Sequence, residues 1–144
     1  TGNDYQDRTE PWIANSPQEQ QIQLDWNLAL AMLRVHLVGV EQAGFSSNYR
    51  IGGELRFYLN GQELTEARHA VAQVEPLSRG GTYITLERPL AADRIIFIAN
   101  VISGTRNGSK APVALSEIEV IGQGATPQAL SSQPSQVLLP FVAP

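Results

Sequence analysis

Few residues in this chain stand at spacings that could support catalysis. His36 and His69 are the only histidines, and neither belongs to a His-Glu-x-x-His pattern that would hold zinc. The carboxylates are scattered along the chain. Glu117 and Glu119 would share one face of a strand, which suits a charged edge as well as an acid and a base. We therefore predict that the chain is not an enzyme.

Aromatic and arginine side chains in predicted loops indicate a different chemistry, the binding of sugars. Aromatic rings offer flat apolar faces to a sugar ring, and guanidinium groups donate forked hydrogen bonds to hydroxyl groups. Nine of the ten basic residues are arginine. The candidate ligand-binding residues are Trp12, Phe45, Tyr49, Arg50 and Arg106. Trp12 also fits a core position, an alternative that the sequence leaves open.

Runs of alternating apolar and polar residues predict the framework that carries these candidates. In residues 20–26, Ile22, Leu24 and Trp26 alternate with glutamines and Asp25, which is typical of a half-buried strand. Residues 28–33 have the composition of a helix, but the alternation that follows them favours a strand. Asn60-Gly61 predicts a tight hairpin turn whose second strand begins near residue 62. Further strands are expected at residues 33–37, 55–59, 83–87, 94–101 and 115–121, and together they indicate an all-β, antiparallel sandwich.

The composition changes after residue 121. Gly, Ala, Thr, Pro, Gln and Ser dominate the next stretch, which is typical of a flexible linker. An apolar run then follows, with Val137, Leu138, Leu139, Phe141 and Val142, too short to fold alone and too hydrophobic to leave in water. We expect a sandwich domain at 1–121, a linker at 122–136 and an apolar tail strand at 137–144 that docks on a sheet edge.

Four short motifs follow one another in a familiar order. Asp4, Thr9 and Trp12 precede the predicted strand at 20–26, Gln-Gln-Ile-Gln-Leu-Asp-Trp. Leu59-Asn60-Gly61 lies in a central hairpin, and Ser116-Glu117-Ile118-Glu119-Val120 closes the domain. This order resembles the discoidin, or galactose-binding-like, family, which includes coagulation-factor C-type and carbohydrate-binding-module domains. The resemblance spans residues 4–121 and implies a jelly-roll β-sandwich.

The same resemblance implies a structural calcium ion between the first loop and the last strand. The matching side chains are Asp4, Thr9 and Glu117. Calcium takes six to eight oxygen ligands, so these three would form part of its shell. The chain departs from the family because no glycine follows Asp4. Ordinary solvent-exposed roles for Asp4 and Glu117 are the alternative.

The resemblance also implies an empty strand position. In the family a strand precedes the aspartate loop and lies beside the last strand, whereas three residues precede Asp4 here. Residues 137–142 could fill the position, because a sheet edge offers unpaired backbone groups. The fourteen residues from 122 to 135 reach roughly 20 Å on average and about 45 Å when extended. The tail could therefore dock in cis or in trans, and docking in trans would build a filament or a ring.

Composition narrows the partners and the location. The chain has 144 residues, a formal net charge of -4 and no cysteine, so it offers no basic surface for nucleic acid and forms no disulfide. No apolar run approaches the roughly 20 residues of a membrane helix. Because the chain begins at Thr1 with neither methionine nor a tag, we expect a processed protein that is secreted, extracellular or at the cell surface.

These observations predict a non-catalytic, extracellular structural or adhesive subunit. It would assemble with other copies of itself into a filament or similar polymer by donating its C-terminal strand. The alternative, from a different functional class, is a monomeric carbohydrate-binding module that recognises cell-surface or extracellular glycans, with its tail folded onto its own domain. The place where the tail docks distinguishes the two.

Overall fold

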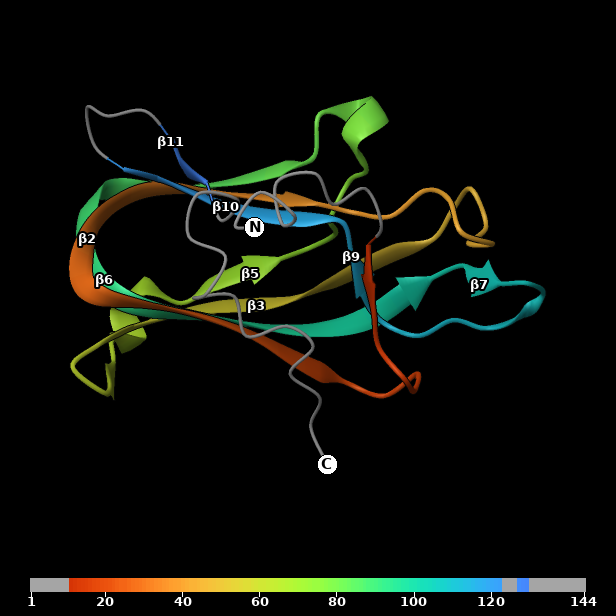
Figure 1. Ribbon diagram of the computed structural model, residues 1–144, viewed down its shortest axis with the longest axis horizontal. Helices are drawn as coiled ribbons and strands as arrows, with labels where there is room; N and C mark the ends of the chain where they lie inside the picture. The colour runs from red at the N-terminus through yellow and green to blue at the C-terminus, as the bar shows by residue number, and fades with distance from the viewer. Residues whose placement is uncertain (1–10, 123–126, 130–144) are drawn as a thin grey trace, which may run out of the picture.

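The computed structural model describes residues 11–122 and 127–129, and these residues form antiparallel β-sheets (Figure 1). The prediction of an all-β, antiparallel sandwich is confirmed. Two single-turn 3-10 helices, η1 and η2, are the only helical segments in these ranges, and neither is long or apolar enough to cross a membrane. The elements are β1 Trp12–Ile13, β2 Gln20–Val38, β3 Arg50–Leu59, β4 Gln62–Glu63, η1 Thr65–Ala67, β5 His69–Val71, η2 Leu77–Arg79, β6 Thr82–Ser103, β7 Thr105–Arg106, β8 Ser109–Lys110, β9 Ala114–Leu115, β10 Glu117–Gly122 and β11 Pro127–Ala129.

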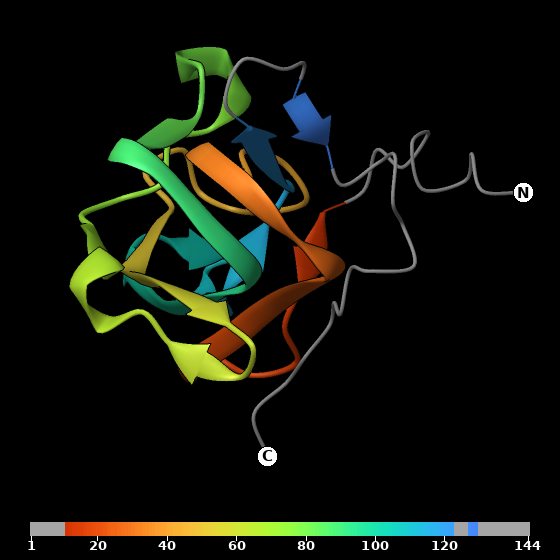
Figure 2. The same ribbon diagram turned by 90° about the vertical axis from the view of Figure 1, so that its left-hand side faces the viewer.

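Two long, bent strands pass through both layers of the sandwich. The main sheet has the order β11-β10-β2-β6-β3-β4, with β5 beside β3. Residues 20–25 of β2 pair with 94–99 of β6, and residues 30–37 of β2 pair with 82–92 of β6. The register shifts between these two sets, and such bulges bend a strand. β2 and β6 therefore fold over together, as the left side of Figure 1 and the end-on view in Figure 2 show.

Each layer is completed by different partners. β3 pairs with residues 94–103 of β6, whereas β10 pairs with residues 32–38 of β2. The runs predicted at 20–26 and 33–37 are thus two arms of one strand, as are those at 83–87 and 94–101. The break that resembled a turn in the sequence, Pro89 to Asp93, lies where β6 bends.

The core lies between the two layers and follows the period-2 pattern. Ile22 and Leu24 come from the first arm of β2 and Val35 and Leu37 from the second, and all four are fully buried. Trp12 is only 7% exposed, and its strand β1 pairs with β9. Trp12 therefore belongs to the core.

The hairpin predicted at Asn60-Gly61 is confirmed. Both residues have positive φ angles, 52° and 83°, which suits a tight turn between antiparallel strands. The partner strand β4 begins at Gln62, and Leu59 is paired with it.

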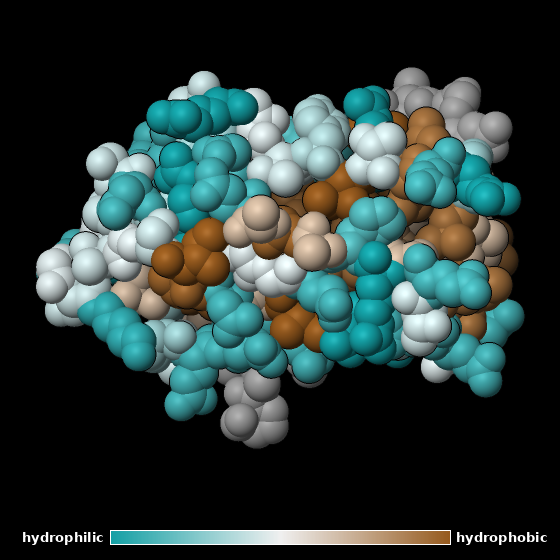
Figure 3. Space-filling model, turned by 180° about the vertical axis from the view of Figure 1, so that it is seen from behind, coloured by the Kyte–Doolittle hydropathy of each residue, from teal (hydrophilic) through white to brown (hydrophobic). Residues whose placement is uncertain are grey.

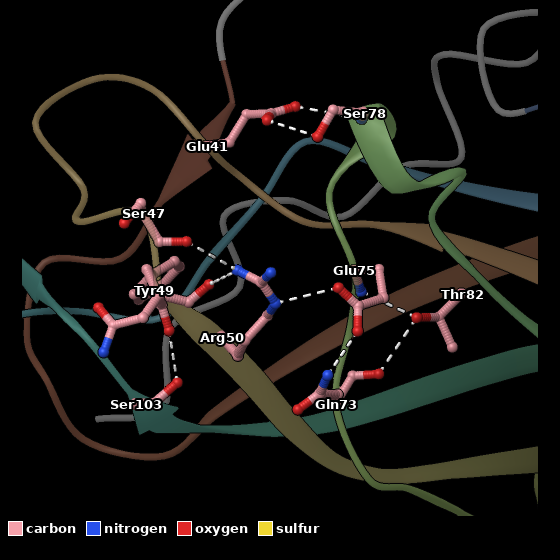
Figure 4. A network of polar contacts seen from close by, with 10 residues as sticks. Glu41, Ser47, Tyr49, Arg50, Gln73, Glu75, Ser78, Thr82 and Ser103 are labelled. Carbon is pink, nitrogen blue, oxygen red and sulfur yellow. Dashed lines mark hydrogen bonds and ion pairs between the residues drawn. The ribbon is translucent and has the colours of Figure 1, made fainter.

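A network of polar contacts fastens the segment that crosses from β5 to β6 (Figure 4). The Arg50 Nε donates to the Glu75 carboxylate at 3.1 Å. The Glu75 backbone N–H donates to the Thr82 hydroxyl at 2.8 Å, and that hydroxyl donates to the Gln73 carbonyl at 3.1 Å. The network thereby joins β3 of one layer to the beginning of β6 in the other.

Two leucines of β2 test the assignment of its faces. Leu24 has no exposed surface, whereas Leu28, at the bend, is 78% exposed. We expect Leu24→Ala to lower the free energy of unfolding by about 2–5 kcal/mol, because it removes buried methyl groups and leaves a cavity. Leu28→Ala, the matched control, should change it by less than about 0.5 kcal/mol. Urea denaturation of both variants measures the difference; equal losses would contradict the arrangement of this strand.

Candidate functional site

The predicted sugar-binding residues at the loop end of the sandwich serve mainly the interior. The rings of Phe45 and Tyr49 pack with their centres 4.3 Å apart, and the Arg106 guanidinium lies 5.0 Å from the centre of the Phe45 ring. Phe45 is 7% and Tyr49 2% exposed. The structure thus brings three of the candidates together. Trp12, Phe45 and Tyr49 are all buried in the core, which leaves little of each ring exposed to a ligand.

The two arginines of the predicted site hold loops in place. Arg50 donates to the backbone carbonyls of Ser47 and Tyr49 at 3.3 and 2.7 Å, in addition to its ion pair with Glu75. The Arg106 Nε donates to the Ala43 carbonyl at 3.0 Å. Much of their hydrogen-bonding capacity is therefore used within the protein, and sugar binding by these residues stays a prediction.

Because of the buried Tyr49 hydroxyl, we expect the free energy of unfolding to fall at alkaline pH. It donates to the Pro112 carbonyl at 2.6 Å, and burial raises its pKa well above the ordinary value of 10.0. The unfolded chain releases this proton near pH 10 while the folded chain retains it, so the free energy of unfolding should fall as the pH rises above about 10.

Tyr49→Phe should flatten this alkaline decline and, at neutral pH, cost about 1 kcal/mol for the lost hydrogen bond. The control is Tyr83→Phe, since Tyr83 is 48% exposed. Denaturation series between pH 8 and about 11 measure both slopes. An unchanged slope in Tyr49→Phe would contradict the assignment.

Of the three predicted calcium ligands, only Glu117 lies among the residues that the structure describes. Asp4 and Thr9 lie outside the described residues. Glu117 begins β10, opposite Val38, and its side chain is exposed at the sheet surface. Partial burial of the carboxyl group, and then the neighbouring Glu119, raise the pKa of Glu117. Within residues 11–122 and 127–129 no group of three His, Asp or Glu side chains could hold a metal ion, so calcium stays a prediction.

A polar cluster that the sequence did not predict covers the outer face of β2, β6 and β10. The His36 ring stacks on Tyr83 with the ring centres 4.1 Å apart, and the Arg34 guanidinium lies 5.0 Å from the centre of the same ring. The two ring nitrogens of His36 lie 3.3 Å from the Glu119 carboxylate and 2.9 Å from the Gly80 carbonyl. His36 is thereby engaged on both sides, which favours a structural role.

Two adjacent glycines test the importance of this cluster. A methyl group at position 81 would come within 2.4 Å of the His36 Nε2, whereas one at position 80 would meet nothing within 4 Å. Both glycines have positive φ, so each alanine costs about 1 kcal/mol of backbone strain. We expect Gly81→Ala to cost about 1–3 kcal/mol more than Gly80→Ala, because its methyl group displaces His36 and also comes within 2.8 Å of the Leu37 carbonyl oxygen. Thermal and urea denaturation compare them; similar losses would mean that the contact does not matter.

A hollow that the sequence did not indicate lies between η1 and residues 86–90 of β6. It is partly open and has a volume of about 750 Å³. Apolar side chains and charged groups share its walls. The lining residues are Leu64, Thr65, Glu66, Ala67, Arg68, His69, Leu86, Glu87, Arg88, Pro89 and Leu90. A cleft of this size suits a ligand or an inserted peptide segment. Its residues come from two segments about twenty positions apart, so no local motif could have marked it.

The sheet edges are the second candidate feature. β11, at one end of the main sheet, lies inside the predicted linker and pairs with Glu119–Ile121 of β10. The rest of that linker and the predicted assembly residues Val137, Leu138, Leu139, Phe141 and Val142 lie outside the described residues. At the opposite edge of the same layer, residues 82–92 of β6 have β2 as their only strand partner within the described part of the chain.

Exposed apolar side chains are few and scattered. The large ones are Leu28 at 78%, Leu77 at 67%, Ile102 at 49% and Tyr83 at 48% exposed. In the view of Figure 3, hydrophobic patches alternate with hydrophilic side chains over the described surface.

Comparison with protein-family models, with curated proteins and with solved structures found no match for this chain.

Proposed function

We propose that this chain is a non-catalytic structural or adhesive subunit that assembles with other copies of itself by donating residues 137–142 as a strand to a neighbour. The observation that carries the proposal is the incomplete edge of the sandwich: residues 82–92 of β6 have a strand partner on one side only within the described ranges. An open edge is a template for an incoming strand. The apolar run at residues 137–142 is the segment that we propose as the incoming strand.

The chemistry of the tail supports docking. Val137, Leu138, Leu139, Phe141 and Val142 carry no polar group, and each would expose apolar surface to water at a cost of about 25 cal/mol per Å². A partner surface removes that cost. Pro140 lacks a backbone N–H, so this segment fits an outer strand better than a central one.

The position of β11 favours an acceptor other than the chain's own last strand. We had expected the tail to fill a position beside the strand that closes the domain. Residues 127–129 of the same chain already pair with that strand, β10. Residues 137–142 therefore need another edge, and a neighbouring molecule provides one.

The wider setting belongs to the same proposal. A secreted or cell-surface location suits a subunit of a filament. On the basis of the sequence resemblance, we also propose that the chain is related to the galactose-binding-like family and that it holds a structural calcium ion. The rival function is a monomeric carbohydrate-binding module. With the predicted aromatic rings buried, it would draw on the cleft at the seam, where Arg68, Arg88 and Glu66 offer groups for sugar hydroxyls.

Removing the tail tests the proposal. We expect the full chain to form polymers and a chain ending at Ala129, which retains β11, to be monomeric. Leu139→Glu with Phe141→Glu in the full chain should also weaken assembly, because two charges would be buried at the interface. Multi-angle light scattering and negative-stain microscopy measure size and order.

The outcomes separate the two functions. Polymers from the full chain alone support strand donation. If the full and shortened chains are both monomers with the same unfolding midpoint, strand donation is wrong, and a glycan array becomes the next measurement. Polymers from both chains would place the assembly contact elsewhere on the sandwich.

A further inference from the structure

We infer that the acceptor site for the donated strand is the cleft between η1 and residues 82–92 of β6, and that it receives residues 137–142 of a second copy of the chain. This inference rests on the proposed function and adds the site where assembly occurs. Three features of the described residues carry it: an unpaired backbone edge, an apolar groove beside that edge, and the placement of the groove relative to β11.

The backbone edge is the first feature. Residues 82–85 and 90–92 pair with β2, residues 86–89 lie in an irregularity of the register, and no other strand is paired to residues 82–92 in the described ranges. In an antiparallel ladder every second residue directs its N–H and C=O groups away from a given neighbour. The two paired stretches therefore present backbone donors and acceptors on the side away from β2, and residues 86–89 between them line the cleft. An incoming strand would satisfy them.

The groove is the second feature. Leu64 and Ala67 line it from the side of η1, and Leu86 and Leu90 line it from β6. Leu86 is 6% exposed, and the other three are half-buried. The walls therefore offer apolar contacts, and a volume of about 750 Å³ accommodates several side chains.

The pattern of the tail fits this groove better than it fits the edge at β11. A strand that is apolar on both faces suits a place that is covered on both faces. In the groove, Leu64 and Ala67 on the η1 side and Leu86 and Leu90 of β6 offer apolar contacts on two walls. Beside β10, by contrast, the outer face carries His36 and Glu119, and a strand added there would be expected to alternate between apolar and polar residues.

The charged rim of the cleft makes the site selective. Arg68 is held in a forked ion pair by Glu63, with one N–O distance of 2.8 Å. Glu87, Arg88 and Pro89 stand together on the edge strand. Charges and proline on an edge discourage pairing with arbitrary strands. A specific partner must place its apolar side chains between these groups and over Leu86.

The placement of donor and acceptor is the third feature. β11 and residues 82–92 of β6 lie on opposite edges of one layer, with β10 and β2 between them. Three strand spacings separate them by roughly 14 Å. A donor at one edge and an acceptor at the other give a head-to-tail contact, which continues from molecule to molecule as a filament or closes into a ring.

Engineered disulfides test the site directly, because the chain has no cysteine of its own. Ala67→Cys places a thiol in the groove, and Leu139→Cys places one in the tail. Leu138→Cys, tested in parallel, covers the other face of the tail. The matched control combines each tail cysteine with Gln128→Cys in β11. We expect the Ala67 pair to give a ladder of cross-linked oligomers on non-reducing gels, with at least tenfold less cross-linking for the control.

Each other outcome has a defined meaning. If the parent chain polymerises but cross-links form only with Gln128→Cys, the inferred groove is wrong while strand donation stands. A disulfide within single chains, identified by peptide mapping, overturns docking in a second copy. If the parent chain does not polymerise at all, the proposed function fails, and this inference with it.

A second variant tests the groove without cysteines. Ala67→Arg places a bulky charge in the cleft and should reduce polymer mass at least tenfold. Gln62→Arg, in the exposed hairpin between β3 and β4, is the control and should leave assembly unchanged. The unfolding midpoints of both variants verify that each remains folded. Normal polymers from a folded Ala67→Arg variant would overturn the inference.

Discussion

The antiparallel pairing of β2 with β6 is the constraint on which the structure depends. The two strands remain paired through a shared bend, so a single ribbon supplies the middle of both layers. Bulges at the bend let the register shift while most of the ladder is kept. β3 can then add to one arm of β6 and β10 to one arm of β2, and apolar side chains from all four strands meet between the layers.

The same bend explains why β6 has a strand partner on one side only at residues 82–92, within the described part of the chain. A strand that is central in one layer becomes an edge in the other, because its partner on that side ends at the bend. Residues 82–92 of β6 are such an edge in the described structure, and the cleft beside η1 opens along it. The candidate binding surface is therefore a consequence of how the two layers are built.

Polar side chains in this protein mostly fasten loops to the sandwich. Arg50 ties the loop before β3 to Glu75, and His36 joins Glu119 of β10 to the turn at Gly80. Burying such groups is favourable only when their hydrogen bonds are satisfied. Arg50, which looks suited to a ligand, has limited capacity left for one, because it already donates to Glu75 and to the Ser47 and Tyr49 carbonyls.

The sequence by itself determined the local features of this protein. Period-2 alternation placed Ile22, Leu24, Val35 and Leu37 on the core side of strands, and Asn60-Gly61 marked a hairpin, because both depend on neighbours along the chain. Only the tertiary structure decided that the arms on either side of Pro89 form one bent strand, that Phe45 is covered by Arg106, and that η1 faces β6 across a cleft. Those features depend on contacts between residues far apart in sequence, and such contacts leave no local pattern to read.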